Sequence, residues 1–393
     1  MSKRYDIIVL GLGSTGSSIT YFLARKNASN VLAIDARCSG CGQTSRSSAL
    51  IRLHYTNPVI RSMAIYSWRF WREFQDHTGC EYPVFTKTGI AFVGPEDYID
   101  TMNEIVHDIR SKGIEAYLYD PTEFKKEVYK NFNEDGIAGV AWEPESGYGD
   151  PNTSVRCFIE YARKNGVEVL EYTSVKKLLR EDSKIIGIET EDGVIKGEIF
   201  INALGVWCND LLATINKQLP IKYAREDVIY LENPGDIDRI PPGWGDLVYG
   251  FYSRPDGATK TLVGTLEAEY VDNYDEPGEY TTPPMDIVNK RMEIFTRRFP
   301  DMIRARPSSV IYGYYDVTPD WQPIIGYDNE IENLIHMVGL SGHGFKLAPA
   351  YGEVISDIAL YGRSKTFNID EFKIDRFYVG VSKHSKYKYG IIG

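Results

Sequence analysis

The chain has 393 residues, 43% of them hydrophobic and 13% aromatic, which is enough for one large or two interleaved domains. Its net charge of −11, without a long basic run, argues against nucleic-acid binding. No apolar run could span a membrane and residues 1–4 leave no room for a signal peptide, so we expect a cytoplasmic protein. Five cysteines argue against a disulfide scaffold and fit a reducing compartment.

A glycine-rich turn near the N-terminus gives the first functional prediction. A strand over residues 5–10 leads into Gly11-Leu-Gly-Ser-Thr-Gly16, and apolar residues at helical spacing follow. A second strand, over residues 31–34, ends in Asp35, whose carboxylate can accept hydrogen bonds from the hydroxyls of an adenosine ribose. Together these elements predict a dinucleotide site with the pyrophosphate at the helix N-terminus. The pattern leaves NAD and FAD open.

The next segment, residues 36–49, is a loop rich in glycine and serine. It holds Cys38 and Cys41 as a single CxxC, and no second CxxC completes a zinc or cluster site, so we expect no metal. Two small residues in a loop are the favoured interpretation, and a redox-active pair is the alternative. Arg52, on a short apolar segment after the loop, is either a solvated charge or an anion clamp.

The remaining elements alternate between two patterns. Residues 81–145 form an inserted α+β region, whereas residues 146–215 return to the α/β pattern of the first fifty residues. From residue 219 to residue 310 the pattern is again strand-like, and a second glycine-rich turn, Gly339–Lys346, later opens another helix. The predicted helices cover residues 61–74, 98–112, 151–165 and 285–299, and a further helix with apolar residues between 347 and 358 follows the second glycine-rich turn. The predicted strands cover residues 88–93, 114–119, 167–170, 184–190, 194–196, 199–201, 228–231, 247–251, 261–263 and 334–338.

Four motifs together resemble the D-amino-acid oxidase superfamily of FAD enzymes, over about residues 4–362. They are the first glycine turn with Asp35, the Ala203-Leu-Gly205 turn, the segment 316–326 and the second glycine turn. Within that superfamily the sarcosine oxidase, dimethylglycine dehydrogenase and glycine oxidase branch is the most similar.

The resemblance implies an α/β fold with two interleaved domains. The first is a glutathione-reductase-type, Rossmann-like FAD-binding domain, and the second is an α+β substrate domain with an antiparallel sheet. The FAD-binding domain takes residues 1–80, 146–215 and 315–363, and the substrate domain takes residues 81–145 and 216–314. The polar tail, residues 364–393, either covers a subunit contact or is poorly ordered, and both a homo-oligomer and a hetero-subunit stay open.

FAD is the cofactor that the resemblance implies, with its adenine half on the first glycine turn and its isoalloxazine ring at the second. The helix N-terminus there favours the negative charge that builds up on the reduced ring. The cofactor-binding residues implied are Gly11, Gly13, Ser14, Thr15, Gly16, Asp35, Ala36, Arg37, Thr44, Ser45, Arg46, Val175, Ala203, Gly205, Trp207, Gly313, Gly342, His343, Gly344, Phe345 and Lys346.

In this family an arginine and a lysine hold the substrate carboxylate, and these positions fall on Arg52 and Lys346. The anion clamp therefore replaces the surface interpretation of Arg52. Tyr315 falls where a family tyrosine borders the substrate pocket. Sarcosine oxidases that bind FAD covalently use a cysteine two residues before this tyrosine, but this chain has Gly313 there, so we predict non-covalent FAD.

A lysine that promotes reaction with O₂ in those oxidases is replaced here by Leu262. Lys260 lies two residues earlier, on the same face of an extended strand, and either substitutes for it or is a solvated surface lysine.

The activity that the resemblance implies is oxidation of the C–N bond of an amino acid or N-methylated, sarcosine-like amino acid. Hydride transfer to the flavin gives an imine. The substrate is a small amine carrying a carboxylate, and O₂ or another acceptor takes the electrons. One alternative is the flavin-bearing subunit of a larger proline or sarcosine dehydrogenase complex. Another is a flavin-binding protein without turnover. A plain NAD dehydrogenase would not explain the second glycine turn.

Overall fold

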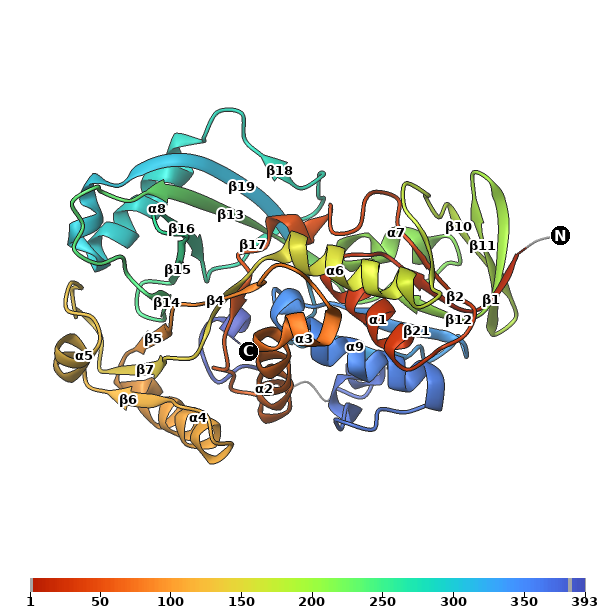
Figure 1. Cartoon of the computed structure of the whole chain (residues 1–393), viewed down its shortest axis with the longest axis horizontal. Helices are drawn as coiled ribbons and strands as arrows, with labels where there is room; N and C mark the ends of the chain where they lie inside the picture. Colours follow the sequence, from red (N-terminus) through yellow and green to blue (C-terminus); the bar gives the residue numbers. More distant parts are fainter. Residues whose placement is uncertain (1–2, 381–383, 393) are drawn as a thin grey trace.

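The protein is built around two large sheets that lie side by side along its long axis (Figure 1). The computed structural model describes residues 3–380 and 384–392. In Figure 1 one sheet lies beside the N-terminus at the right, and the other forms the left half of the molecule. Across the described residues, no helix has both the length and the apolar character needed to cross a membrane.

The first sheet has eight strands and a mostly parallel centre. Its central strand, β1, is flanked by β12 and β2, and β21 follows on the other side of β12, all four strands running parallel. The carboxyl ends of β2, β1, β12 and β21 therefore meet at one edge, with Asp35 and all three glycine-containing turns. The strands are β1 (Arg4–Leu10), β2 (Val31–Ile34), β9 (Glu168–Leu170), β10 (Lys177–Glu181), β11 (Lys184–Thr190), β12 (Gly193–Asn202), β20 (Ile324–Tyr327) and β21 (Leu334–Val338).

Helix α1 (Ser14–Arg25) is the buried centre of the helical layer that covers this sheet. It packs against α9 (Gly344–Tyr361) and α6 (Pro151–Lys164), and α2 (Pro58–Arg72) packs against α9. A Cβ on Gly352 would lie 2.4 Å from the Ser18 hydroxyl, so glycine at 352 permits the close approach of α1 and α9. Two short helices, α3 (Phe74–Thr78) and α7 (Cys208–Ala213), complete this half.

The second sheet has ten strands, which come from the two separate stretches 81–145 and 216–314. Its last strand, β19, continues past the second stretch to Val317. Neighbouring strands of this sheet run antiparallel, except for the parallel pair of β14 and β5. The long antiparallel pair of β13 and β19 extends toward the first sheet. The strands are β5 (Ile90–Gly94), β6 (Tyr117–Tyr119), β7 (Gly139–Glu143), β13 (Lys222–Glu232), β14 (Gly243–Asp246), β15 (Phe251–Asp256), β16 (Lys260–Thr265), β17 (Glu269–Val271), β18 (Gly278–Glu279) and β19 (Arg306–Val317). Helices α4 (Ile99–Ser111), α5 (Pro121–Glu127) and α8 (Met285–Arg298) accompany it. A small sheet of β3 (Leu50–Ile51), β8 (Gly147–Gly149) and β4 (Phe85–Lys87) lies between the large sheets.

One predicted strand, over residues 247–251, is wrong. The chain turns at residues 247–250, between β14 and β15. The carboxylate of Asp246 accepts hydrogen bonds from the backbone N–H groups of Val248 and Tyr249, at 3.1 and 2.8 Å, and Gly250 has φ +74°. An apolar run with these turn-forming residues at its ends therefore makes a tight connection instead of a strand.

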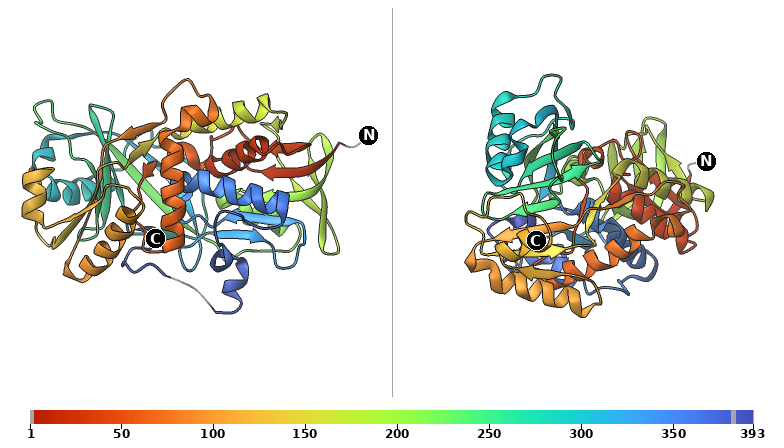
Figure 2. Two further views of the ribbon diagram at one scale, coloured as in Figure 1. Left: turned by 60° about the horizontal axis from the view of Figure 1, so that its bottom comes forward. Right: turned by 60° about the vertical axis from the view of Figure 1, so that its left-hand side comes forward.

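The expectation that the C-terminal tail, residues 364–393, is poorly ordered is wrong for its described residues. The tail packs back on the protein with buried side chains, and Figure 2 shows its blue ribbon lying against the rest of the molecule. Its buried residues include Phe372, Ile374, Tyr387, Tyr389, Ile391 and Ile392.

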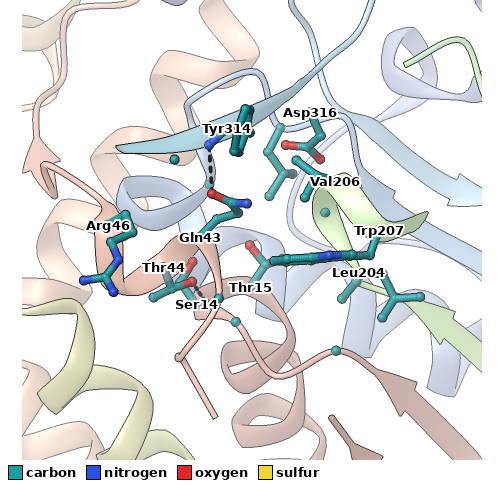
Figure 3. A pocket seen from close by; sticks show the side chains of 18 of the residues that line it. Ser14, Thr15, Gln43, Thr44, Arg46, Leu204, Val206, Trp207, Tyr314 and Asp316 are labelled. Carbon is teal, nitrogen blue, oxygen red and sulfur yellow. Dashed lines mark hydrogen bonds between the residues drawn. The ribbon is translucent and has the colours of Figure 1, made fainter. Parts of the chain in front are cut away.

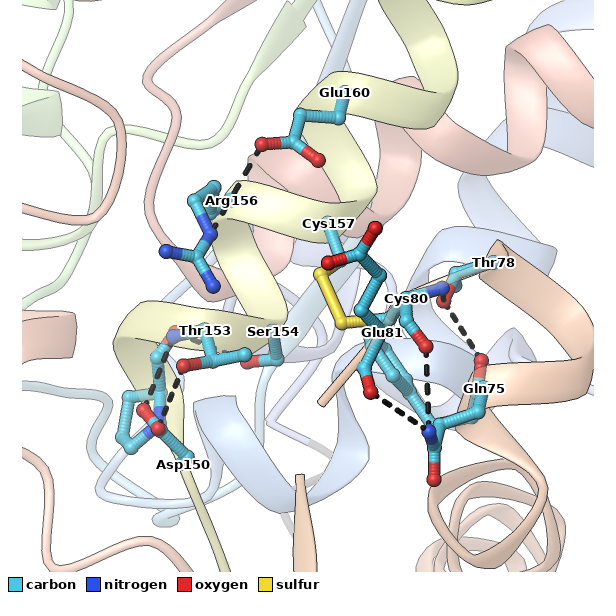
Figure 4. The surroundings of a disulfide bond; sticks show 12 residues. Gln75, Thr78, Cys80, Glu81, Asp150, Thr153, Ser154, Arg156, Cys157 and Glu160 are labelled. Atoms are coloured by element: carbon cyan, nitrogen blue, oxygen red, sulfur yellow. Dashed lines mark hydrogen bonds and ion pairs between the residues drawn. A yellow bond between two sulfur atoms is a disulfide. The ribbon is translucent and has the colours of Figure 1, made fainter. Parts of the chain in front are cut away.

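The described part of the chain contains two disulfide bonds, which the argument from the number of cysteines did not predict. Cys38 bonds to Cys41 within the loop after β2, and Cys80 bonds to Cys157 on α6. Figure 4 shows the second bond joining the segment after α3 to α6. It links residues 77 positions apart, which only the packing of α3 on α6 brings together. Cys208 is buried and unpaired.

Candidate active site

The first glycine turn is packed so tightly that only glycine fits at its ends. Gly11 has φ +92°, and a Cβ there would lie 2.7 Å from the carbonyl oxygen of Ala203. A Cβ on Gly16 would lie 1.8 Å from the carbonyl oxygen of Gly11. The turn therefore holds β1, α1 and the turn after β12 together, and the first turn of α1 borders the cavity described below.

Asp35 anchors this turn from the end of β2. Its Oδ2 accepts a hydrogen bond from the Leu12 N–H at 2.7 Å, and its Oδ1 accepts one from the Arg37 N–H at 2.9 Å. Burial raises the pKa of this carboxyl, although the two backbone donors and the Arg37 charge oppose the effect. Each oxygen keeps a lone pair for a ligand hydroxyl group.

A cavity of about 490 Å³ runs from this turn to the second glycine turn. Three buried polar atoms on its lining residues have no hydrogen-bond partner within the described part of the chain: Thr15 Oγ1, Gln43 Nε2 and Arg46 Nε. Figure 3 shows these side chains, with the Gln43 amide bonded to the backbone of Tyr314. Buried polar groups normally have partners, so this cavity fits a large polar ligand such as FAD.

Most of the predicted cofactor residues line this cavity. Those that do are Gly11, Gly13, Ser14, Thr15, Asp35, Ala36, Arg37, Thr44, Arg46, Val175, Ala203, Gly205, Trp207, Gly313, Gly342, Gly344, Phe345 and Lys346. Gly16, Ser45 and His343 do not. Gly16 closes the turn from behind. The Ser45 hydroxyl bonds to the Gly42 carbonyl, and the buried His343 ring faces the Tyr55 hydroxyl at 3.4 Å.

The second glycine turn connects β21 to α9 at the other end of the cavity. Gly339, Ser341 and Gly342 all have positive φ, between +50° and +82°. The Gly339 N–H donates to the Asp316 carboxylate at 2.6 Å, and burial raises the pKa of this carboxyl to about 6. The N-terminus of the eighteen-residue helix α9 therefore faces a cavity lined by Gly342, Gly344 and Lys346.

Gly313 leaves no room for a side chain beside Gln43. The Gln43 Oε1 accepts a hydrogen bond from the Tyr314 N–H at 2.8 Å, and a Cβ on Gly313 would lie 2.9 Å from the same oxygen. The Gln43 amide thereby holds its unpartnered Nε2 in the cavity wall. Sequence reasoning missed Gln43, although its place next to Thr44 in the glycine- and serine-rich loop was an available signal.

The two predicted carboxylate-binding residues lie close enough to act on each other. The half-buried Lys346 lines the cavity, and its Nζ donates to the Gly342 carbonyl at 2.9 Å. Burial and the Arg52 charge hold the pKa of this lysine well below its usual value. Burial likewise lowers the pKa of Arg52. The guanidinium of Arg52 lies 3.9 Å from the ring centre of Tyr55.

Arg52 itself is covered by the C-terminal tail and is not among the cavity-lining residues. Its Nη2 donates to the Ile391 carbonyl at 2.8 Å and its Nη1 to the Ile392 carbonyl at 3.2 Å, and Nη1 also bonds to the His54 carbonyl. The Tyr387 hydroxyl lies 2.8 Å from His54 Nε2, which fixes the tail beside Arg52. Sequence reasoning found no role for the tail, because its carbonyl groups are not distinguishable in a sequence.

Of the other two predicted catalytic residues, one lines the cavity and one does not. Tyr315 lines the cavity, and its Cε1 lies 3.5 Å from the place of a Cβ on Gly342. Lys260, the first residue of β16, is paired across the sheet with Asp256 and Glu232 and is not among the cavity-lining residues. Sequence reasoning missed several further lining residues. Two of them, Glu226 and Tyr252, interact electrostatically with Tyr315.

Comparison with known proteins places this geometry in a family. The family described as "DAO: FAD dependent oxidoreductase" matches residues 6–358. Monomeric sarcosine oxidase from Bacillus sp. (strain B-0618) is 27% identical over 396 residues, which cover 96% of this chain and 97% of that protein. N-methyl-L-tryptophan oxidase from Escherichia coli is 25% identical over 388 residues, which cover 95% of this chain and 100% of that protein.

Solved structures agree with this result. The crystal structure of L-proline dehydrogenase from P. horikoshii superposes with a TM-score of 0.86 at 26% identity, covering 98% of this chain and 100% of that one. Glycine oxidase from Geobacillus kaustophilus shares the fold, with a TM-score of 0.78 at 19% identity, over 95% of this chain and 99% of that one. The chain is an FAD-dependent oxidoreductase and belongs to the DAO family.

Proposed function

We propose that this protein oxidises the C–N bond of an amino acid or N-methylated amino acid to an imine. FAD, when bound, supplies the two-electron acceptor for this reaction. One observation carries the proposal: Lys346 lines the end of the cavity where α9 begins, and the charge of the buried Arg52 guanidinium behind it acts on its ammonium. Two cations sheltered from water form a site for a carboxylate. The names of the relatives, sarcosine oxidase and N-methyl-L-tryptophan oxidase, support this substrate class.

Both cations retain donors for a substrate. A lysine ammonium has three N–H groups, and Lys346 uses one on the Gly342 carbonyl. A guanidinium has five, and Arg52 uses three on carbonyl groups of His54, Ile391 and Ile392. The tail carbonyls thus hold Arg52 in place while two of its N–H groups remain for a carboxylate. Fixing the carboxylate in this way orients the adjacent Cα–N bond.

The buried histidines near this site are poor bases. Burial holds the pKa values of His54 and His343 well below the usual range, and the charge of Arg52 lowers both further. The proposed reaction therefore depends on orientation and electrostatics and not on a side-chain base, and His343 helps to shape the second glycine turn.

A second candidate is the flavin-bearing subunit of a larger amino-acid dehydrogenase that passes electrons to an acceptor other than O₂. Leu262 favours it, because this fully buried leucine occupies the position where the oxidases have a lysine that promotes reaction with O₂. The likeness to L-proline dehydrogenase from P. horikoshii also supports this candidate.

The domain division belongs to the same proposal. Residues 1–80, 146–215 and 315–363 would bind FAD without a covalent link. Residues 81–145 and 216–314 would cover the substrate.

The test is anaerobic mixing of the purified holoenzyme with sarcosine, dimethylglycine, proline, glycine and D-amino acids. Loss of the oxidised-flavin absorbance with one of these amines supports the proposal and identifies the substrate class. Rapid recovery of the absorbance in air favours an oxidase, and slow recovery favours the dehydrogenase subunit. An absorbance that none of these amines changes would contradict the proposal and favour a flavin-binding protein without turnover.

A further inference from the structure

Two carboxylates of the ten-stranded sheet line the cavity, and whereas Asp316 is bonded to the Gly339 N–H, Glu226 keeps an oxygen without a bond. Glu226 lies on β13 and is 6% exposed, and it lines the cavity together with Tyr252, Tyr315 and Lys346. Its charge acts on both tyrosines, and the ring of Tyr315 lies beside Gly342, whose carbonyl binds Lys346. The carboxylate and the cationic pair therefore lie at the same end of the cavity.

One oxygen of this carboxylate is fixed and the other is free. Oε1 accepts hydrogen bonds from the Thr265 N–H at 2.9 Å and from the Tyr252 hydroxyl at 3.2 Å. A Cβ on Gly264 would lie 2.6 Å from Oε1, so glycine at 264 leaves the space that this carboxylate occupies. The described residues offer no hydrogen-bond partner to Oε2.

The surroundings leave the charge of this carboxylate largely uncompensated. Arg291 on α8 acts on it electrostatically but does not bond to it, and Asp227 adds like charge. Burial is the main cause that raises the pKa of Glu226, to about 8. A buried acid without a bonded cation in a ligand cavity is complementary to a donor that a ligand brings.

We propose that Glu226 is the amine-recognition residue of this site: its free Oε2 accepts a hydrogen bond from an N–H of the substrate amine. Lys346 and Arg52 take the carboxylate of the same molecule, so the proposal rests on the proposed function. The site then selects α-amino acids whose reacting nitrogen bears a hydrogen, which are primary and secondary amines. A tertiary amine such as dimethylglycine has no N–H in its neutral, reacting form.

The test uses two carboxylates that the enzyme cannot oxidise. Pyrrole-2-carboxylate presents a ring N–H, and 2-furoate has an oxygen in its place. Each is titrated into the holoenzyme, and the perturbation of the flavin absorbance gives a Kd without turnover. We expect the wild-type protein to bind pyrrole-2-carboxylate about fivefold more tightly than 2-furoate, as one additional hydrogen bond allows.

Glu226→Ala should abolish this preference by weakening pyrrole-2-carboxylate alone, with the Kd of 2-furoate changed less than about twofold. Glu226→Gln keeps a carbonyl acceptor and should restore part of the preference. Glu232→Ala is the matched control, because this exposed glutamate at the end of the same strand does not line the cavity. Thermal unfolding and flavin content establish that each variant is folded.

A preference that survives Glu226→Ala would overturn the proposal, and so would equal weakening of both ligands or a wild-type protein without any preference. Because the titration measures binding alone, it gives this answer even if no amine bleaches the flavin. Failure of the proposed function is thereby distinguishable from failure of the role of Glu226.

Discussion

Replacing Lys346 by methionine tests the carboxylate site while it preserves the length of the side chain. The Lys346 ammonium has two N–H groups that are not used on the Gly342 carbonyl. Loss of one hydrogen bond between charged groups costs about 1.5–3 kcal/mol, which corresponds to about a 10- to 150-fold rise in KM for an amino-acid substrate. Arg52 stays in place, so binding weakens but is not abolished.

The comparison substrate is an amine without a carboxylate, such as N-methylethanolamine in place of sarcosine. Its KM should change less than about threefold in Lys346→Met, because it makes no bond to the ammonium. The assay is the rate of anaerobic loss of flavin absorbance against substrate concentration. Lys290→Met, on the exposed side of α8, is the matched control and should behave as the wild-type protein.

The dependence on pH gives a second readout of the same group. Only the ammonium form binds a carboxylate, and burial together with the Arg52 charge lowers the pKa of Lys346. The wild-type KM for the amino acid should therefore rise with pH, starting well below the ordinary lysine pKa of 10.5. Lys346→Met should lack this rise. Equal effects of the substitution on both substrates, or an unchanged pH profile, would refute the assignment.

Three further predictions concern the cofactor and stability. Acid precipitation should release FAD into the supernatant, because Gly313 offers no cysteine for a covalent link; colour that stays in the pellet would contradict this. Arg298→Met should lower the free energy of unfolding by about 3–5 kcal/mol in a denaturant titration, because it leaves the fully buried Asp246 carboxylate, 2.7 Å from the guanidinium Nε, without its cation. A loss below about 1 kcal/mol would contradict this value. Cys80→Ala should lower the same quantity by about 2–4 kcal/mol without reductant, because its bond to Cys157 closes a loop of 77 residues. Reduced wild-type protein should match the variant, and unchanged stability of the variant would argue against the bond.

The cofactor end of the site was predictable because its signals are local. The strand, the turn Gly11–Gly16 and helix α1 are consecutive in the chain, and Asp35 follows within twenty residues. The contact of Gly16 with Gly11 also lies within one turn. Such short-range steric requirements select glycine at fixed positions, and a sequence displays them directly.

The substrate end was only partly predictable, since its contacts join distant segments. Arg52 meets carbonyl groups some 340 residues away, and every residue type carries such a carbonyl. Glu226 belongs to a strand whose inward face is set by pairing with β19 and β16, so its position in the cavity follows from tertiary structure. The bond of Cys80 to Cys157 was not predictable for the same reason, because only the tertiary structure brings the two cysteines together.

The buried end of the tail has a practical consequence for producing the protein. Ile391 and Ile392 are buried and their carbonyl groups hold Arg52, whereas Lys3 and Arg4 at the other end are exposed. Residues that follow Ile392 have to leave from beside the proposed carboxylate site. An affinity tag there risks pulling the tail away from Arg52, so recombinant protein intended for kinetics should carry its tag at the N-terminus.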